Sequence, residues 1–398
     1  MMDMAECARI SRSTTRRTFV SQFPILFAVP ASFAQGDDRP GTAKAGVPDL
    51  AGKSAEVDRL LAAWDSASGP GAAVVVTDNN RVVHRKGYGL ADREKKRQFL
   101  AHTPSLIGSV AKQFVAMPIM MLAEKGKLSY DDPLSKFFPN AGPNGQAIKL
   151  RHLLNHTSGL TQFEEYRDRR KRNIPQIQDE LVTSYVRNTS VRFAPGDKFE
   201  YCNGGYVVLA SVAAKVANTG FRELMHEWVF TPLQMNGTFF AEEHSRLNSV
   251  ERAIGYYKER FGLKVSETLE ALSLYGGAAS IFSTADDMQQ WDQALHSEKL
   301  AKSATLSEAF RGGRLNDGTQ LAYGFGWENM RYKGVRYMIH PGGWAGFKSF
   351  ILRFPDQGFS AIALSNHSEF DLTNLPLAIA RVYLADRVEV PTKIFNMQ

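Results

Sequence analysis

Residues 106–114, LIGSVAKQF, place Ser109 and Lys112 three positions apart, where loop and strand sequence gives way to a helical pattern. Ser109 follows Gly108 and is therefore predicted to lie near a helix N-terminus, where unpaired N–H groups and the helix dipole favour negative charge. Lys112, one turn later, falls on the same helix face. Serine is a weak nucleophile until a neighbouring group takes its proton, and a crowded lysine can help with this. The pair predicts either a nucleophilic site or an ordinary helix start.

Two further motifs bear on that choice. The stretch FEYCNGGY supplies Tyr201 and Asn203 as the only Y-x-N of the chain, and IHPGGWAGF supplies His340 and Gly342 as its only H-x-G. A single S-x-x-K is weak support, because a chain of this length contains about one by chance. Three unique motifs in a fixed order favour the nucleophilic site.

With these motifs the chain resembles the serine β-lactamase and penicillin-binding protein family, especially the branch of class C β-lactamases, family VIII esterases and D-aminopeptidases. The resemblance covers about residues 55–385 and includes RHLLNHTSGL, FAPGDKFEYCNGGY and GGAASIFSTADDM, which are typical of that branch. It implies an α/β (α+β) fold in which helices flank an antiparallel sheet and an all-helical domain is inserted.

The resemblance also implies a role for individual residues. Ser109 would attack an ester or amide carbonyl and become acylated, while Lys112 and Tyr201 would handle its proton. Free lysine and tyrosine both titrate near pH ~10, so at least one pKa must be shifted, and which residue carries the proton stays open. Asn203 would orient Lys112 and the substrate, and the N–H groups of Ser109 and Gly343 would form the oxyanion hole.

The third motif departs from the family pattern. It reads His340-Pro341-Gly342, where class C β-lactamases and D-alanyl-D-alanine carboxypeptidases carry Lys-Thr-Gly to engage a substrate carboxylate. Histidine is mostly neutral at pH 7 and proline has neither hydroxyl nor N–H, so this recognition should weaken. His340, Gly342 and Gly343 are still predicted to line the substrate site together with Asn203.

The sequence therefore predicts a serine hydrolase of the esterase or D-amino-acid peptidase type. A β-lactamase or D-alanyl-D-alanine carboxypeptidase is the first alternative. A penicillin-binding or scaffold protein of the same fold without turnover is the second. The expected substrate is a small ester, amide or peptide, for which cell-wall fragments are one source.

The order of predicted elements suggests two structural domains. Two β-like runs, 72–77 and 81–86, flank a turn and predict a hairpin, and four more runs follow after residue 320. Helical periodicity dominates between them. We expect an α/β sheet domain from residues 51–100 and 276–398, with a helical domain, 101–275, inserted.

The N-terminus is similar to a twin-arginine export signal. Arg16 and Arg17 precede a short apolar run, and small residues follow it before Gln35. The run is too short for a stable membrane anchor. We expect a signal peptide over residues 1–34, a flexible leader over 35–50, and a periplasmic or secreted mature protein.

Composition excludes several classes of protein. The net charge of +7 over 398 residues is only mildly basic. Because an exported protein meets anionic envelope polymers rather than nucleic acid, no nucleic-acid partner is predicted. Only Cys202 would survive removal of the signal, and no metal-binding motif occurs. No metal and no cofactor are predicted, and the oligomeric state is left open.

Overall fold

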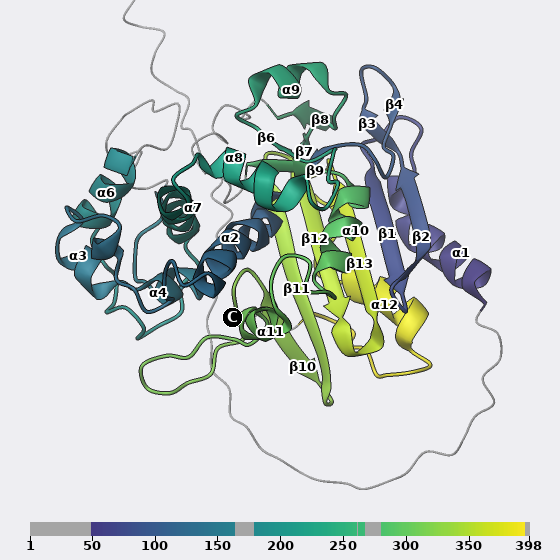
Figure 1. Ribbon diagram of the computed structural model, residues 1–398. Helices are drawn as coiled ribbons and strands as arrows, with labels where there is room; N and C mark the ends of the chain where they lie inside the picture. The colour runs from purple at the N-terminus through teal and green to yellow at the C-terminus, as the bar shows by residue number, and fades with distance from the viewer. Residues whose placement is uncertain (1–48, 164–178, 261, 267–279, 395–398) are drawn as a thin grey trace, which may run out of the picture. The chain divides into compact units, whose positions relative to one another are not determined.

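The computed structural model describes residues 49–163, 179–260, 262–266 and 280–394 (Figure 1). These residues all lie within one compact unit, Asp38–Ile394. The predicted signal peptide and residues 35–48 of the predicted leader lie outside the described residues. No helix in the described ranges is both long enough and apolar enough to cross a membrane.

A six-stranded antiparallel sheet forms the centre of the fold, as predicted. Its strand order is β10-β11-β12-β13-β1-β2, so strands from both ends of the chain pair side by side (Figure 1). The central strand β13 is buried along its whole length. The strands are β1 (Ala72–Asp78), β2 (Arg81–Tyr88), β10 (Glu328–Tyr332), β11 (Val335–Trp344), β12 (Phe347–Phe354) and β13 (Phe359–Ser365).

Two tight turns set the register of this sheet. Asn79 and Asn80 connect β1 to β2 with φ of 49° and 58°, and Ala345 and Gly346 connect β11 to β12 with φ of 51° and 81°. Two successive residues with positive φ are the signature of a type I′ turn, whose twist matches that of antiparallel strands. The second turn brings Gly343 opposite Lys348.

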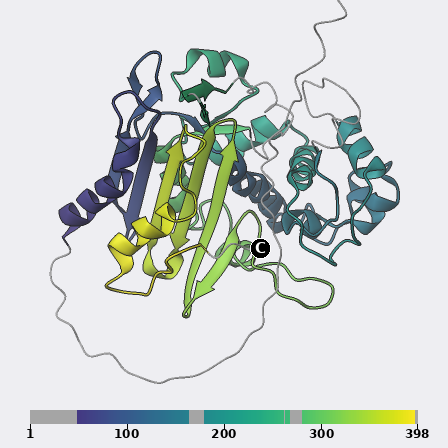
Figure 2. The same ribbon diagram turned by 180° about the vertical axis from the view of Figure 1, so that it is seen from behind.

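Helices cover both faces of the sheet. Helices α1 (Leu50–Leu61) and α12 (Leu375–Leu384) pack on one face, which is turned to the viewer in Figure 2. Helix α10 (Ala285–Ala294) packs on the other face, where Asp292 accepts a 2.6 Å hydrogen bond from the Arg353 Nε of β12. A buried ion pair therefore joins this helix to the sheet.

Helix α2 (Lys112–Glu124) is buried on nearly every side. One continuous hydrophobic core contains its side chains, side chains of α7 (Asn203–Ala217), and the α10-facing side of the sheet. Pro118 lies inside α2 without ending it. The described remaining helices are α3 (Gly142–Ala147), α4 (Leu150–Leu154), α6 (Asp179–Asn188), α8 (Phe221–Met225), α9 (His244–Ser249) and α11 (Ser303–Ala309), with short 3₁₀ or π turns at Ala62–Trp64, Gly108–Ala111, Leu134–Lys136, His226–Phe230 and Pro355–Gln357.

Short strands occur where the sequence suggested only helices. They form a three-stranded sheet in the order β5-β9-β6 and a β7–β8 hairpin. Each strand has two to four residues, too few for a clear alternating pattern. They are β5 (Ser105–Leu106), β6 (Phe239–Phe240), β7 (Tyr256–Glu259), β8 (Gly262–Val265) and β9 (Ile281–Ser283), and a further hairpin pairs β3 (Leu90–Asp92) with β4 (Arg97–Gln98).

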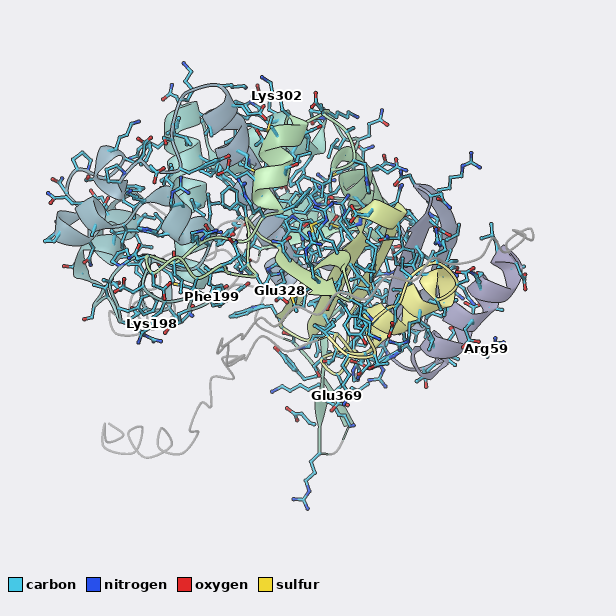
Figure 3. All side chains as sticks on the ribbon, turned by 90° about the horizontal axis from the view of Figure 1, so that it is seen from below. Arg59, Lys198, Phe199, Lys302, Glu328 and Glu369 are labelled. Carbon is cyan, nitrogen blue, oxygen red and sulfur yellow. The ribbon has the colours of Figure 1, made fainter. Side chains whose placement is uncertain are left out.

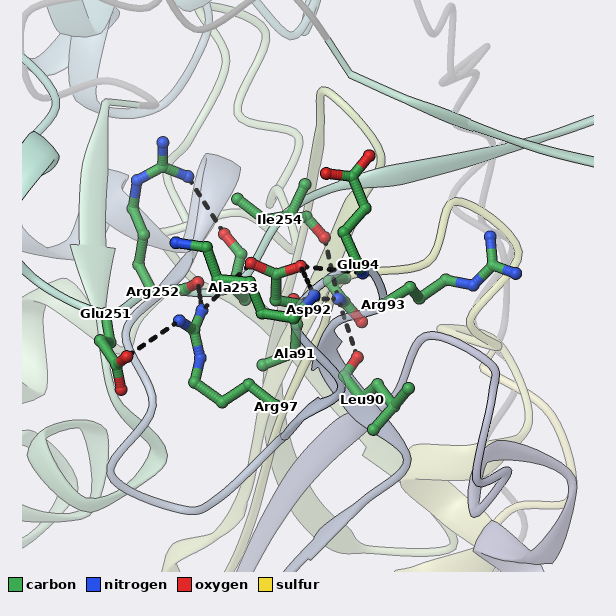
Figure 4. A network of polar contacts seen from close by, with 12 residues as sticks. Leu90, Ala91, Asp92, Arg93, Glu94, Arg97, Glu251, Arg252, Ala253 and Ile254 are labelled. Atoms are coloured by element: carbon green, nitrogen blue, oxygen red, sulfur yellow. Dashed lines mark hydrogen bonds and ion pairs between the residues drawn. The ribbon is translucent and has the colours of Figure 1, made fainter.

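A polar network ties the β3–β4 hairpin to residues 250–254 (Figure 4). The Arg97 guanidinium donates to the carbonyl of Arg252 and lies 3.6 Å from the Glu251 carboxylate and 4.0 Å from that of Asp92. Ile254 N donates to Ala91 O at 2.8 Å. These contacts fix the loop beside a cavity of about 380 Å³.

Single residues set two element boundaries. Helix α1 begins after Asp49, whose side chain caps it by accepting from Gly52 N at 2.8 Å, so Ser54 lies inside the helix. The stretch 323–329 was expected to be a strand, but β10 begins only at Glu328, because Gly326 adopts φ of +79° and turns the chain.

Candidate active site

A glycine places Ser109 against the sheet. Gly108 has φ of +53°, and a Cβ at this position would lie 2.7 Å from the backbone nitrogen of Gly343 in β11. Only glycine permits both this conformation and this approach. Ser349 reinforces the contact by donating from Oγ to Ile107 O at 2.7 Å. The 3₁₀ turn that carries Ser109 is therefore held beside the Gly343 N–H group.

Lys112 begins α2 and has no exposed surface. Its Nζ donates to Ser109 Oγ at 3.2 Å and to Asn203 Oδ1 at 2.8 Å. The same ammonium lies 4.7 Å from the centre of the Tyr201 ring. The structure thus brings together the Ser109, Lys112, Tyr201 and Asn203 of the first two motifs.

The Tyr201 hydroxyl oxygen is buried and makes no hydrogen bond within the part of the chain described. Burial raises the pKa of Tyr201 well above its usual value of 10, and the neighbouring Ser109 hydroxyl acts in the opposite direction. Ser109 therefore lies close to the phenol oxygen, although the pair does not reach hydrogen-bonding geometry. A phenol with this pKa is protonated at neutral pH.

Gln162 connects the two residues of the second motif and was not identified from the sequence. Its Nε2 donates to Tyr201 O at 2.6 Å, and its Oε1 accepts from Asn203 N at 3.1 Å. The amide thus fixes the backbone on both sides of Cys202, where α7 begins. Nothing in the local sequence signals this role, because Gln162 lies about 40 positions from its partners.

His156 packs against the Tyr201 ring. The two ring centres are 4.2 Å apart, and His156 Nδ1 accepts from Cys202 N at 3.1 Å. Burial, followed by the charge of Lys112, holds the pKa of His156 well below 6.5. Its φ of 56° agrees with a turn, but the ring also orients Tyr201.

His340 is buried in β11, and both ring nitrogens have partners within the chain. Its Nδ1 lies 2.7 Å from the carbonyl oxygen of Pro341, and its Nε2 lies 2.9 Å from the Tyr323 hydroxyl. Because a carbonyl only accepts, Nδ1 carries the proton and Nε2 accepts from Tyr323. Burial, with the charge of Lys112 adding to it, lowers the pKa of His340 to about 3. The imidazole is therefore neutral at physiological pH.

The two glycines of the third motif allow close approach on opposite sides of β11. A Cβ on Gly342 would lie 2.1 Å from Ile107 O, and a Cβ on Gly343 would lie 3.2 Å from Lys348 Nζ. Gly342 therefore faces the turn that carries Ser109, whereas Gly343 presents its nitrogen to Gly108. The roles of His340, Gly342 and Gly343 in contacting a substrate remain predictions.

Glu328 adds a carboxyl group that the sequence analysis did not identify (Figure 3). It opens β10 opposite Ile339, one residue before His340. Burial raises its pKa to about 7, and its charge contributes to the raised pKa values of Tyr201 and Tyr323. A negative charge near these phenols keeps them protonated.

The arrangement can support attack by an activated hydroxyl group. Ser109 lies close to the buried Lys112 amine and the buried Tyr201 phenol, and either of these can accept the serine proton once it has lost its own. Backbone N–H groups beside Ser109 can stabilise an oxyanion. Within the described ranges, no group of three or more His, Cys, Asp or Glu side chains is placed to hold a metal ion.

Comparisons with known proteins extend this description. The family model described as Beta-lactamase matches residues 57–384. Penicillin-binding protein 4* of Bacillus subtilis is 31% identical over 74% of this chain and 68% of its own length. Among solved structures, the octameric penicillin-binding protein homologue from Pyrococcus abyssi aligns with a TM-score of 0.72 at 23% identity, covering 85% of this chain and 78% of the homologue. A class C β-lactamase aligns with a TM-score of 0.70 at 20% identity, covering 87% and 99%.

Proposed function

Because the chain belongs to the β-lactamase family of serine hydrolases, we propose that it hydrolyses an ester or amide bond through an acyl-enzyme on Ser109. The predicted family is thus confirmed, and so is the predicted fold. The observation that carries the proposal is the pair of hydrogen bonds from buried Lys112 to Ser109 and Asn203, at 3.2 and 2.8 Å, beside the Tyr201 phenol.

The proposed reaction has two balanced halves. Ser109 Oγ attacks the carbonyl carbon while its proton passes to the Lys112–Tyr201 pair, which accepts it in the form that has lost one proton, either as the free amine or as the phenolate. The N–H groups of Ser109 and Gly343 stabilise the oxyanion. The same pair returns the proton to the leaving alcohol or amine. Water then attacks the acyl-enzyme and gives its proton to the pair, which restores it to Ser109 as the acid leaves.

An esterase or D-amino-acid peptidase is favoured over a β-lactamase. His340 is neutral and already hydrogen-bonded within the chain, and Pro341 has no hydroxyl group. The third motif therefore offers no cation and no side-chain donor to a carboxylate. Asn203, His340, Gly342 and Gly343 are proposed to line the substrate site.

We further propose that the protein acts in the periplasm or outside the cell. Arg16 and Arg17 in the N-terminal segment support export by the twin-arginine route. A mature protein beginning near Gln35 in the periplasmic or secreted fraction is expected. A full-length protein retained in the cytoplasm would contradict this proposal.

Three probes test the hydrolase: a short-chain 4-nitrophenyl ester, D-alanine 4-nitroanilide and a chromogenic cephalosporin. We expect turnover of the ester, the anilide or both, and a loss of roughly 1000-fold or more in kcat for Ser109→Ala. Efficient cephalosporin hydrolysis would overturn the argument from His340. No turnover of any probe, with slow labelling by penicillin, would instead support the non-turnover protein.

A further inference from the structure

Lys348 lies beside the Gly343 oxyanion donor, on the neighbouring strand. The two residues are directly opposite in the β11–β12 register. A Cβ on Gly343 would lie 3.2 Å from Lys348 Nζ, 3.3 Å from its Cδ and 3.7 Å from its Cε. The lysine side chain therefore runs over the glycine, and its charge is located within a few ångström of the Gly343 backbone.

The alternation of β11 indicates which side of the strand Lys348 occupies. His340 and Gly342 are buried and face the turn of Ser109, whereas Pro341 and Gly343 are partly exposed. Successive residues of a strand point to opposite sides, and directly paired residues share a side. Lys348 thus shares the partly exposed side with Pro341 and Gly343.

The Lys348 ammonium forms neither a hydrogen bond nor an ion pair with any residue that the structure describes. Burial lowers its pKa, as expected for a cation that has lost part of its hydration without gaining a counter-ion. A partly buried charge without a partner is unfavourable, and an anion bound beside it relieves that cost. The neighbouring His340 contributes no charge of its own.

We propose that Lys348 is a specificity-determining residue that selects substrates with a carboxylate close to the scissile carbonyl. This inference rests on the proposed hydrolase, because it identifies the substrate class of the same site. The carbonyl oxygen would bind at the Gly343 N–H while the carboxylate meets the Lys348 ammonium on β12, a cation that the third motif on β11 does not supply. An acidic ester or amide would then be preferred over its neutral isostere.

Two matched pairs of esters test the preference on each side of the scissile bond. On the leaving-group side, 4-acetoxybenzoate is compared with 4-acetoxybenzamide. On the acyl side, mono-4-nitrophenyl adipate is compared with its terminal amide. Each pair differs in one charge at nearly constant size, so the ratio of kcat/KM values measures charge selection.

The variants separate charge from packing. Lys348→Met should lower kcat/KM for the acidic member of at least one pair about tenfold, as expected for loss of a close ion pair in a partly hydrated site. The kcat/KM of the neutral member should stay within about twofold of wild type. Lys348→Arg should keep most of the preference. Lys302→Met is the matched control, because it removes the same charge from an exposed lysine before α11 (Figure 3).

Equal losses on acidic and neutral esters, or none on either, would overturn the inference. If the protein hydrolyses no ester, binding of the same compounds measures the charge preference instead. In Ser109→Ala, equilibrium dialysis should show the adipate monoester binding more tightly than its amide, and Lys348→Met should abolish this difference. Failure to hydrolyse any probe would contradict the proposed function, whereas turnover or binding without Lys348-dependent charge selection would contradict this inference alone.

Discussion

At the residue scale, the properties of Lys112 depend on its surroundings more than on its own chemistry. The side chain has no exposed surface, and its ammonium is shared between a serine hydroxyl and an asparagine oxygen. Burial keeps the nearby Tyr201, His156 and His340 in their uncharged forms. Neutral rings thus surround the Lys112 amine, and Lys112 and Tyr201 are the titratable groups placed to exchange a proton with Ser109.

His340 should make the folded protein sensitive to acid. Its pKa is about 3 in the fold and near 6.5 in an unfolded chain, so between these values unfolding takes up a proton. Stability should therefore fall as the pH decreases from 6.5 towards 3, by up to about 1.4 kcal/mol per pH unit from this residue. Urea denaturation of wild type and His340→Gln at pH 6.5, 5.5 and 4.5 measures the difference, because a glutamine side chain does not titrate. Parallel pH dependences would show that His340 is not the source.

The sequence indicated residues that the fold brings together, but not how they are supported. Ser109, Lys112, Tyr201 and Asn203 belong to short motifs, and motifs report local spacing. Gln162, Tyr323 and Glu328 act through tertiary contacts, and each is an ordinary residue in its own stretch of sequence. Their roles depend on chain segments that meet only after folding.

At the element scale, the contact between the Gly108–Ala111 turn and β11 aligns the site. The turn approaches the strand so closely that Gly108 and Gly342 each leave no room for a side chain. A helix start alone would not place Ser109 beside Gly343. The sheet does so, because its register fixes where along β11 the glycines fall.

Gly108→Ala should therefore lower kcat by more than the accompanying loss of folded protein can explain. The new Cβ would lie 2.7 Å from the Gly343 nitrogen, and alanine would have to adopt the unfavourable φ of +53°. We expect at least a tenfold loss of kcat, since small displacements at a reacting centre cost about that much or more. Gly126→Ala is the control, because it has φ of +65° and no atom within 4 Å of the new Cβ. It should lose about 1 kcal/mol of stability and keep its activity.

Regular patterns explain which elements were predictable. The hairpin at residues 72–86 and the strands after residue 335 have alternating or continuous apolar residues and turn-forming residues between them. The short strands β5, β6 and β9 have two or three residues and form through distant partners. Both Asp49 and Ser54 are residue types that cap helices, and only the fold shows that Asp49 is the cap and Ser54 lies inside α1.

At the scale of the whole molecule, one face of the sheet shares a hydrophobic core with the helical region, and the other face packs with α1 and α12 in a second core. Val75 and Ile351 of the sheet belong to the same buried cluster as Phe114 of α2 and Val207 of α7. The predicted division into residues 51–100 with 276–398 and residues 101–275 describes the order of elements along the chain. It stays a prediction about that order.

We therefore expect the protein to unfold in one cooperative transition. Two regions that share a core lose packing on both sides when either one opens. Urea unfolding followed by tryptophan fluorescence and by far-ultraviolet circular dichroism should give the same midpoint. Two resolved transitions, or midpoints that differ between the probes, would show that the helical region unfolds independently.

The burial of α2 on nearly every side has a consequence for the timing of reactivity. A helix without a water-facing surface is stable only once its neighbours have packed around it. Ser109 is therefore not activated by Lys112 in an incompletely folded chain. The first detectable turnover during refolding would accordingly mark completion of the native architecture.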